Sequence, residues 1–238
     1  MNISATDYQA LYRLQDQAIA VLSDVLGGFY LTGGTALDRF YLHHRYSDDL
    51  DFFINAADDF KDRVNKIFRK LKSSFVLDES LTLEAETYTR FYIAGLPKLK
   101  IEVVNDVPER WGASNKAMGI DIDNPANILS NKLGCIMSRD EPKDVFDIIV
   151  LAETYSFNWK DVYTQAISKQ ITNETDIAMR LNSFPVHWLE DVPWIKKAFN
   201  PKDISAKLNK IADDLLFARD NSLGLNKPKI ENAVTSQS

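Results

Sequence analysis

The chain has 238 residues, of which 45% are hydrophobic and 26% charged, a composition typical of one soluble globular domain with a helical extension. Its formal net charge of −6 argues against a surface built for non-specific nucleic-acid binding, and its single cysteine, Cys135, excludes an internal disulfide and a cysteine-based zinc site. Since no apolar run reaches the roughly 18 residues of a membrane span and the N-terminus lacks a secretion signal, we expect a cytoplasmic protein without a membrane partner.

The first half of the chain predicts helices and strands in alternation. Apolar residues at helical spacing predict a helix from Thr6 to Leu26, which a diglycine ends. After it we expect a short buried strand at 29–33, a helix at 35–44, a second strand at 50–54 and a long amphipathic helix at 56–72. Alternating apolar residues at 81–95 and 98–106, around a Gly-Leu-Pro-Lys turn, predict antiparallel strands in the same sheet. The sheet is therefore expected to be mixed.

Basic side chains are concentrated on the helix predicted at 56–72. They are Lys61, Arg63, Lys66, Arg69, Lys70 and Lys72. Apolar residues at helical spacing form the opposite stripe, so we interpret the basic residues as a solvated helix face. Contact with a polyanion is the alternative.

From Asn124 onward the pattern is helical. Pro125 and Pro142 suit first helical positions, and further helices are predicted near 159–169, 174–181 and 202–219. The polar residues 226–238 are expected to form a frayed tail. The sequence therefore predicts an α+β fold, with a mixed β-sheet flanked by helices and a helical C-terminal part. We place the boundary between an α/β core at 1–123 and a helical region at 124–238.

A diglycine joins the first predicted strand to the next predicted helix. Gly33 and Gly34 allow the backbone to approach a ligand closely, and a helix that begins near Thr35 aims its first amides outward. Such a turn suits a phosphate group. Alone the motif is weak, because a diglycine between a strand and a helix is more often a tight turn without a ligand.

Two aspartates mark the start of the second predicted strand. Residues two apart in a strand point to the same side, so Asp49 and Asp51 project together while Leu50 and Phe52 face the core. Paired carboxylates repel each other unless a cation lies between them, and oxygen ligands of this kind suit Mg²⁺ or Mn²⁺. The alternative is a strand cap and a solvated edge residue, and Asp48, which points away from the pair, is expected to be solvated.

The stretch TGGTALDRFYLHHRYSDDLDFF therefore combines a phosphate-holding turn with a metal-holding strand. It resembles the signature of the AbiEii/AbiGii toxin family, in the DNA polymerase β-like nucleotidyltransferase superfamily. The resemblance lies in the glycine turn followed by the arrangement of Arg45, Ser47, Asp49 and Asp51. It implies a nucleotidyltransferase-type fold and an enzyme that uses a nucleoside triphosphate (NTP) with Mg²⁺ or Mn²⁺.

The same resemblance assigns roles further along the chain. Lys132 corresponds to a helical lysine that contacts the triphosphate, although Asn131 stands where family members often have an acidic residue. The sequence KDVFD resembles a family element in which Asp144 is the expected site residue and Asp147 the reserve candidate. Glu102 lies where a third metal ligand would complete the site. From the residues alone, Lys132 could instead extend outward from its helix, Glu102 could pair with a basic residue across the sheet, and the aspartates could stabilise a helix N-terminus.

The leading hypothesis is a metal-dependent nucleotidyltransferase. The catalytic candidates are Asp49, Asp51, Lys132 and Asp144, the metal candidates are Asp49, Asp51 and Glu102, and the nucleotide-binding candidates are Gly33, Gly34, Thr35, Arg45, Ser47 and Lys132. By analogy with relatives, the enzyme would be the toxin of a toxin-antitoxin pair, with a cognate antitoxin, and would modify RNA such as tRNA. The alternatives are transfer to a small molecule or a protein, and a catalytically silent protein that binds a partner.

Overall fold

The structure is a computed structural model that describes residues 5–196 and 200–236. Its first half contains α1 (Ala5–Leu22), β1 (Tyr30–Thr32), α2 (Gly33–Leu37), a π-helical continuation (Asp38–Leu42), β2 (Leu50–Asn55) and α3 (Phe60–Ser74). The strands β3 (Leu83–Glu84), β4 (Tyr88–Ile93), β5 (Leu99–Asp106), β6 (Asn115–Ala117) and β7 (Ile120–Ile122) follow. The second half contains α4 (Pro125–Ser138), α5 (Pro142–Thr154), α6 (Trp159–Lys169), α7 (Glu174–Asn182) and α8 (Pro201–Leu216).

The strands form one seven-stranded sheet in the order β3-β4-β5-β2-β1-β7-β6. It is mixed, as predicted, because β2 runs antiparallel to β1 but parallel to β5. The edge hairpin of β6 and β7 was not predicted. Its strands have three residues each, too few for a visible alternation, and Met118 and Gly119 between them both adopt positive φ, as a two-residue type I′ turn requires.

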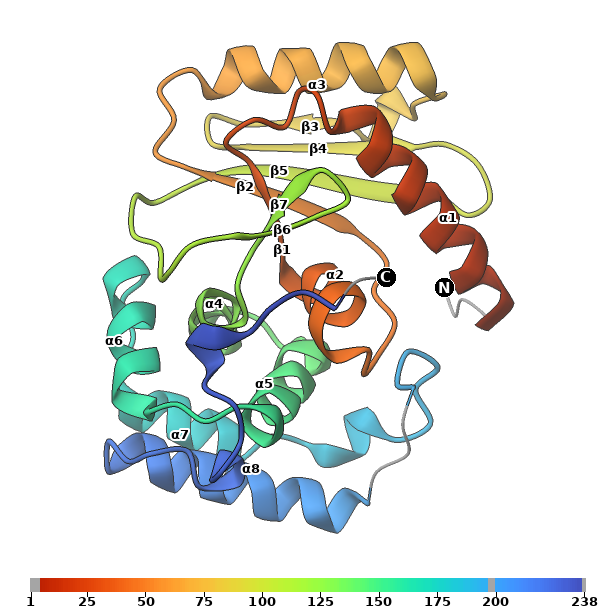
Figure 1. Cartoon of the computed structure of the whole chain (residues 1–238). Helices are drawn as coiled ribbons and strands as arrows, with labels where there is room; N and C mark the ends of the chain where they lie inside the picture. The colour runs from red at the N-terminus through yellow and green to blue at the C-terminus, as the bar shows by residue number, and fades with distance from the viewer. Residues whose placement is uncertain (1–4, 197–199, 237–238) are drawn as a thin grey trace.

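The two faces of the sheet differ in polarity. On β2, Leu50, Phe52 and Ile54 are buried, whereas Asp51 and Phe53 between them are partly exposed. Helices α1 and α3 lie on the buried side, and α4–α8 gather at the other side of the molecule (Figure 1). The open, polar face of the central strands is therefore the face available for chemistry.

Helix α3 supports the solvated-face interpretation of its basic residues. Its apolar stripe is buried, and three of its basic side chains form exposed ion pairs: Arg63 with Asp59, Lys70 with Asp24, and Lys72 with Glu79. Phe68 of α3 also stacks on Phe91 of β4, which lies on the buried face of the sheet. These basic residues therefore do not line the open face.

The helices predicted after Asn124 are all present. Four of them are capped by an asparagine whose side chain accepts a hydrogen bond from a backbone N–H of the first turn. These residues are Asn124, Asn158, Asn173 and Asn200. In the described part of the chain no strand follows β7, and no helix is long and apolar enough to cross a membrane. One hydrophobic cluster includes side chains from both sides of residue 123, so the division into 1–123 and 124–238 stays a prediction.

The prediction of a frayed tail was wrong for residues 226–236. Ile230 is fully buried, and its backbone N–H donates to the Ser156 carbonyl in the helical part. Farther along, the Ser236 N–H donates to the Phe40 carbonyl over 2.8 Å, and Asn115 Nδ2 donates to the Ala233 carbonyl. The prediction failed because it relied on the polar composition, whereas one buried isoleucine and several backbone hydrogen bonds hold the segment in place. Residues 237 and 238 lie outside the described part.

Candidate active site

The diglycine turn lies directly against the paired aspartates. Gly33 has φ +71°, and a Cβ atom there would lie 2.9 Å from Asp51 Oδ2. At Gly34 a Cβ atom would lie 2.1 Å from Arg45 Nη2. Both glycines are thus needed because the backbone approaches charged side chains too closely for any other residue. The turn therefore lies directly beside the carboxylate of Asp51.

A substitution at the turn tests this packing. We expect Gly34→Ala to lower the free energy of unfolding by about 1–3 kcal/mol, because the added methyl group displaces Arg45. Gly27→Ala is the matched control, since a Cβ atom at Gly27 has no neighbour within 4 Å. Urea denaturation of both variants measures the effect. Equal midpoints for the two variants would show that the turn tolerates a side chain.

Three carboxylates gather on the open face of the sheet. Asp51 on β2 is the register partner of Glu102 on the parallel strand β5, and Asp49 precedes β2 by one residue. The Lys100 ammonium lies 2.9 Å from Asp49 Oδ2 and 2.9 Å from Glu102 Oε2. The Tyr88 hydroxyl donates to Glu102 Oε1. The three predicted metal ligands are therefore brought together, with a lysine bridging two of them.

The carboxylates differ in their affinity for protons. Burial, together with the nearby charges of Asp49 and Glu102, raises the pKa of Asp51 to about 7. Burial also raises the pKa of Asp49 despite Lys100. At Glu102 burial is outweighed by hydrogen bonds from Tyr88 and Lys100, so its pKa is lowered. The cluster holds more negative charge than its surroundings balance, as expected of a cation site.

The fit to a divalent cation rests on this donor chemistry. Carboxylate oxygens are the ligands that Mg²⁺ and Mn²⁺ prefer, and their mutual repulsion is what a cation relieves. Within residues 5–196 and 200–236, however, no group of three or more His, Cys, Asp or Glu side chains has converged into a ready metal site. The metal-binding roles of Asp49, Asp51 and Glu102 stay predictions.

A second, buried ion network lies below the turn. Asp147 is fully buried and accepts two hydrogen bonds from Arg45, at 2.6 and 2.7 Å. Its Oδ1 also lies 2.6 Å from His44 Nε2. Lys132 lies 2.6 Å from Asp147 and 2.8 Å from Asp144. Burial alone would raise the pKa of Asp147, but the charges of Arg45 and Lys132 hold it well below its usual value.

This network contradicts the alternative in which Lys132 extends outward from its helix. Lys132 is only 5% exposed and points inward to two aspartates of α5. The helix-terminus explanation of Asp144 and Asp147 is likewise incomplete, because both bind Lys132. The expectation of a solvated Asp48 was wrong, since its side chain is only 28% exposed and Lys143 Nζ donates to its Oδ2 over 2.7 Å.

The other predicted nucleotide-binding side chains support the turn internally. The Thr35 hydroxyl donates to the Asp49 carbonyl and lies 2.9 Å from Ser47 Oγ. Thr35, Arg45 and Ser47 are all buried. Their side chains hold the turn and the start of β2 in place, and a direct contact with a nucleotide stays a prediction.

Two members of the site were not assigned from sequence. Lys100 and Tyr88 reach the carboxylates from β5 and β4. Lys100 had a sequence signal, because it stands two residues before Glu102 and so shares its face of the strand. Tyr88 had none, because its proximity depends on how β4 pairs with β5.

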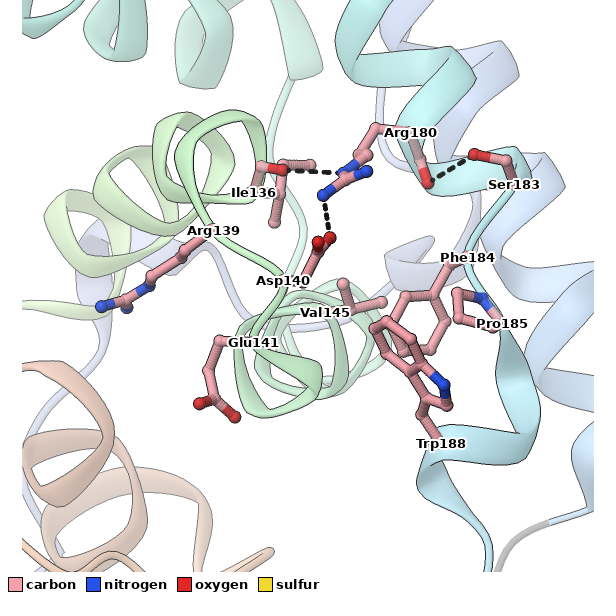
Figure 2. A pocket seen from close by; sticks show the side chains of 10 residues that line it. All are labelled: Ile136, Arg139, Asp140, Glu141, Val145, Arg180, Ser183, Phe184, Pro185 and Trp188. Atoms are coloured by element: carbon pink, nitrogen blue, oxygen red, sulfur yellow. Dashed lines mark hydrogen bonds and ion pairs between the residues drawn. The ribbon is translucent and has the colours of Figure 1, made fainter.

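A separate cavity of about 160 Å³ lies in the helical part. Figure 2 shows Phe184 and Trp188 beside Val145, and Arg180 of α7 reaching to Asp140 and the Ile136 carbonyl. None of the predicted site residues lines it. It is linked to the site by Arg139, whose side chain turns away from the aromatic rings (Figure 2) and donates to Asp144 over 2.7 Å, and by the Glu141 carbonyl, which accepts the Asp144 backbone N–H over 3.0 Å.

Comparisons with known proteins show a family and a shared fold. A family model described as "Nucleotidyl transferase AbiEii toxin, Type IV TA system" matches residues 17–236. JHP933 from Helicobacter pylori has a similar structure, with a TM-score of 0.58, 20% identity, and coverage of 89% of this chain and 92% of that one. The toxin MenT4 from Mycobacterium tuberculosis H37Rv gives a TM-score of 0.61 at 14% identity, covering 89% and 85%.

A further similar structure is a putative nucleotidyltransferase from Helicobacter pylori, with a TM-score of 0.56, 21% identity, and coverage of 88% of this chain and 93% of that one. No curated protein matches the chain in sequence. At these identities the structural likeness shows a shared fold, and the α+β prediction is confirmed.

Proposed function

Since this chain belongs to the AbiEii nucleotidyltransferase toxin family, we propose that it moves a nucleoside monophosphate from an NTP to an acceptor hydroxyl with the help of Mg²⁺ or Mn²⁺. Asp49, Asp51 and Glu102 would hold the metal. Bound there, the metal would supply positive charge to the reacting phosphate and the departing pyrophosphate. The acceptor oxygen forms the new bond to the α-phosphorus as the bond to pyrophosphate breaks.

The observation that carries this proposal is the contact between the turn and the carboxylates. A Cβ atom at Gly33 would lie 2.9 Å from Asp51 Oδ2, so the backbone of the turn lies directly beside a carboxylate that we propose as a metal ligand. Phosphoryl transfer requires amide donors and a metal around the same phosphate group. A tight turn without a ligand does not require three carboxylates beside it.

The protein's own groups have distinct tasks in this scheme. The amides of Gly33 and Gly34 bind phosphate oxygens, and one carboxylate of the cluster accepts the proton of the attacking hydroxyl. Lys132 remains our candidate for the triphosphate contact. An ammonium has three N–H donors, and Asp144 and Asp147 account for two of them. Arg45 and Asp147 keep the turn rigid beneath the nucleotide.

The acceptor is proposed to be RNA, with tRNA as the first candidate. The family description as a toxin supports a cellular macromolecule as the target, and its toxin-antitoxin context supports a cognate antitoxin as partner. We also expect the protein to act in the cytoplasm. The helical region after residue 123, which carries the cavity beside Trp188, is the part we expect to select the acceptor.

Radiolabelled NTPs test the proposal. The purified protein is incubated with Mg²⁺, each α-labelled NTP in turn, and total RNA, total protein or a small-molecule extract. Label in the RNA fraction supports the proposal. Label in the protein or small-molecule fraction would show that the acceptor is a protein or a small molecule and not RNA. An absence of transfer in all fractions, together with an absence of NTP binding, would indicate a silent binding protein of the same fold.

A further inference from the structure

Lys100 is placed between the carboxylates that we propose as metal ligands. It precedes Glu102 by two residues on β5, so both side chains lie on the open face of the sheet. Its ammonium is 2.9 Å from Asp49 Oδ2 and equally 2.9 Å from Glu102 Oε2. These distances are those of charge-assisted hydrogen bonds. Lys100 thus links β5 to the start of β2 across the site.

The negative charge of the cluster attracts both the Lys100 ammonium and a metal ion. Asp49, Asp51 and Glu102 lie together, and Lys100 is the cation that joins Asp49 to Glu102. A divalent cation coordinated by the same oxygens would repel the ammonium at close range. The bridge and a bound metal are therefore alternatives for the same carboxylate oxygens.

The surroundings of Lys100 allow its side chain to move away from the carboxylates. Its side chain is 24% exposed and ends on a flexible stem, so it can rotate toward solvent. Lys132 offers a contrast, because its side chain is 6% exposed and held between two buried aspartates. Of these two lysines, Lys100 is therefore the one that a metal ion could displace.

We infer that Lys100 is the resident counter-ion of the metal site, which keeps the carboxylates together before metal binds and is displaced by the incoming divalent cation. This inference rests on the proposed function and adds a form of regulation to it. The competition sets the metal concentration at which the site fills. If Lys100 bound the carboxylates more weakly, metal would occupy the site at a lower metal concentration. If Lys100 could not be displaced, the enzyme would stay inactive.

Metal binding by the full-length protein, without nucleotide, tests the inference. Mn²⁺ is titrated into wild type and variants, and free Mn²⁺ is followed by electron paramagnetic resonance. We expect Lys100→Met to bind Mn²⁺ about tenfold more tightly, because a competing positive charge is gone. Lys100→Arg should stay near wild type. Lys98→Met is the matched control, since Lys98 is exposed and pairs with Asp78 outside the cluster.

Thermal melting gives a second readout and a safeguard. Without metal, Lys100→Met should melt below wild type, and Mn²⁺ should raise its melting temperature by more than it raises that of wild type. If Lys100→Met does not fold, Lys100→Gln retains a hydrogen-bond donor without the charge and carries the same expectation.

The failures of the two proposals are distinguishable. If wild type binds Mn²⁺ and Asp49→Asn does not, but Lys100→Met binds no more tightly than wild type, the counter-ion role is overturned and the proposed function stands. If no variant binds Mn²⁺ and wild type transfers no nucleotide, the proposed function itself fails.

Discussion

Replacing Asp51 by asparagine should reduce nucleotidyl transfer by a factor on the order of 10³ or more while the protein stays folded. An amide cannot balance a divalent cation as a carboxylate does, and several kcal/mol of transition-state stabilisation depend on that cation. A Cβ atom at Gly33 would lie 2.9 Å from Asp51 Oδ2, so the charge that is removed lies beside the turn that we propose to bind phosphate. Transfer of α-labelled nucleotide at saturating Mg²⁺ measures the effect.

The same variant should be more stable than wild type in the absence of metal, and more so at high pH. The pKa of Asp51 is raised to about 7 in the folded protein, whereas an unfolded aspartate titrates near 3.8. Between these values the folded state binds more protons, so wild-type stability falls as pH rises through 7. Asparagine removes this penalty. Melting temperatures in EDTA at pH 5 and pH 8 should therefore separate the variant from wild type mainly at pH 8.

Asp24→Asn provides the control for both measurements, because Asp24 is exposed and pairs with Lys70 outside the carboxylate cluster. It should leave transfer unchanged and stability within about 1 kcal/mol of wild type. A folded Asp51→Asn protein with normal turnover would remove the carboxylate cluster from the mechanism.

Lys132→Met should lower the free energy of unfolding by about 3–5 kcal/mol. The substitution keeps an unbranched side chain in α4 but leaves Asp144 and Asp147 buried with one positive partner fewer. Combining it with Asp144→Asn should recover part of the loss, because the second change removes one of the unbalanced charges. Urea denaturation of the single and double variants measures both values.

A surface ion pair gives the comparison. Lys70→Met breaks an exposed pair with Asp24 and should cost less than about 1 kcal/mol. A Lys132→Met loss of the same small size would contradict the buried network. In buffer conditions where the variant is folded, NTP titration then addresses catalysis: an affinity equal to that of wild type would remove Lys132 from the triphosphate site.

Local patterns in the sequence were sufficient for most of the framework. Alternation at Asp49, Leu50 and Asp51 correctly placed the carboxylates on the partly exposed face of β2, and prolines at the first positions of α4 and α5 marked where these helices begin. Such signals depend on residues within a few positions of each other, and those positions determine which side of an element is buried.

The connections within the site depend on distant residues and were not predictable in the same way. Arg45 and Asp147 are 102 positions apart, and nothing local to either identifies the other as its partner. The inward direction of Lys132 follows from the packing of α4 against α5, since a lysine in an apolar helix can equally lie along a surface. The hairpin of β6 and β7 was missed because its strands, of three residues each, are too short to show an alternation of apolar and polar residues.

The folded tail has a consequence for motion. It is fastened at Ile230 to the helical part and at Ser236 to the segment that follows the glycine turn. Any hinge movement that separates these two parts must first stretch or detach this tether. We therefore expect substrates to enter and products to leave by local rearrangement of side chains, and we expect an engineered chain shortened before Ile230 to open wider and to release nucleotide faster.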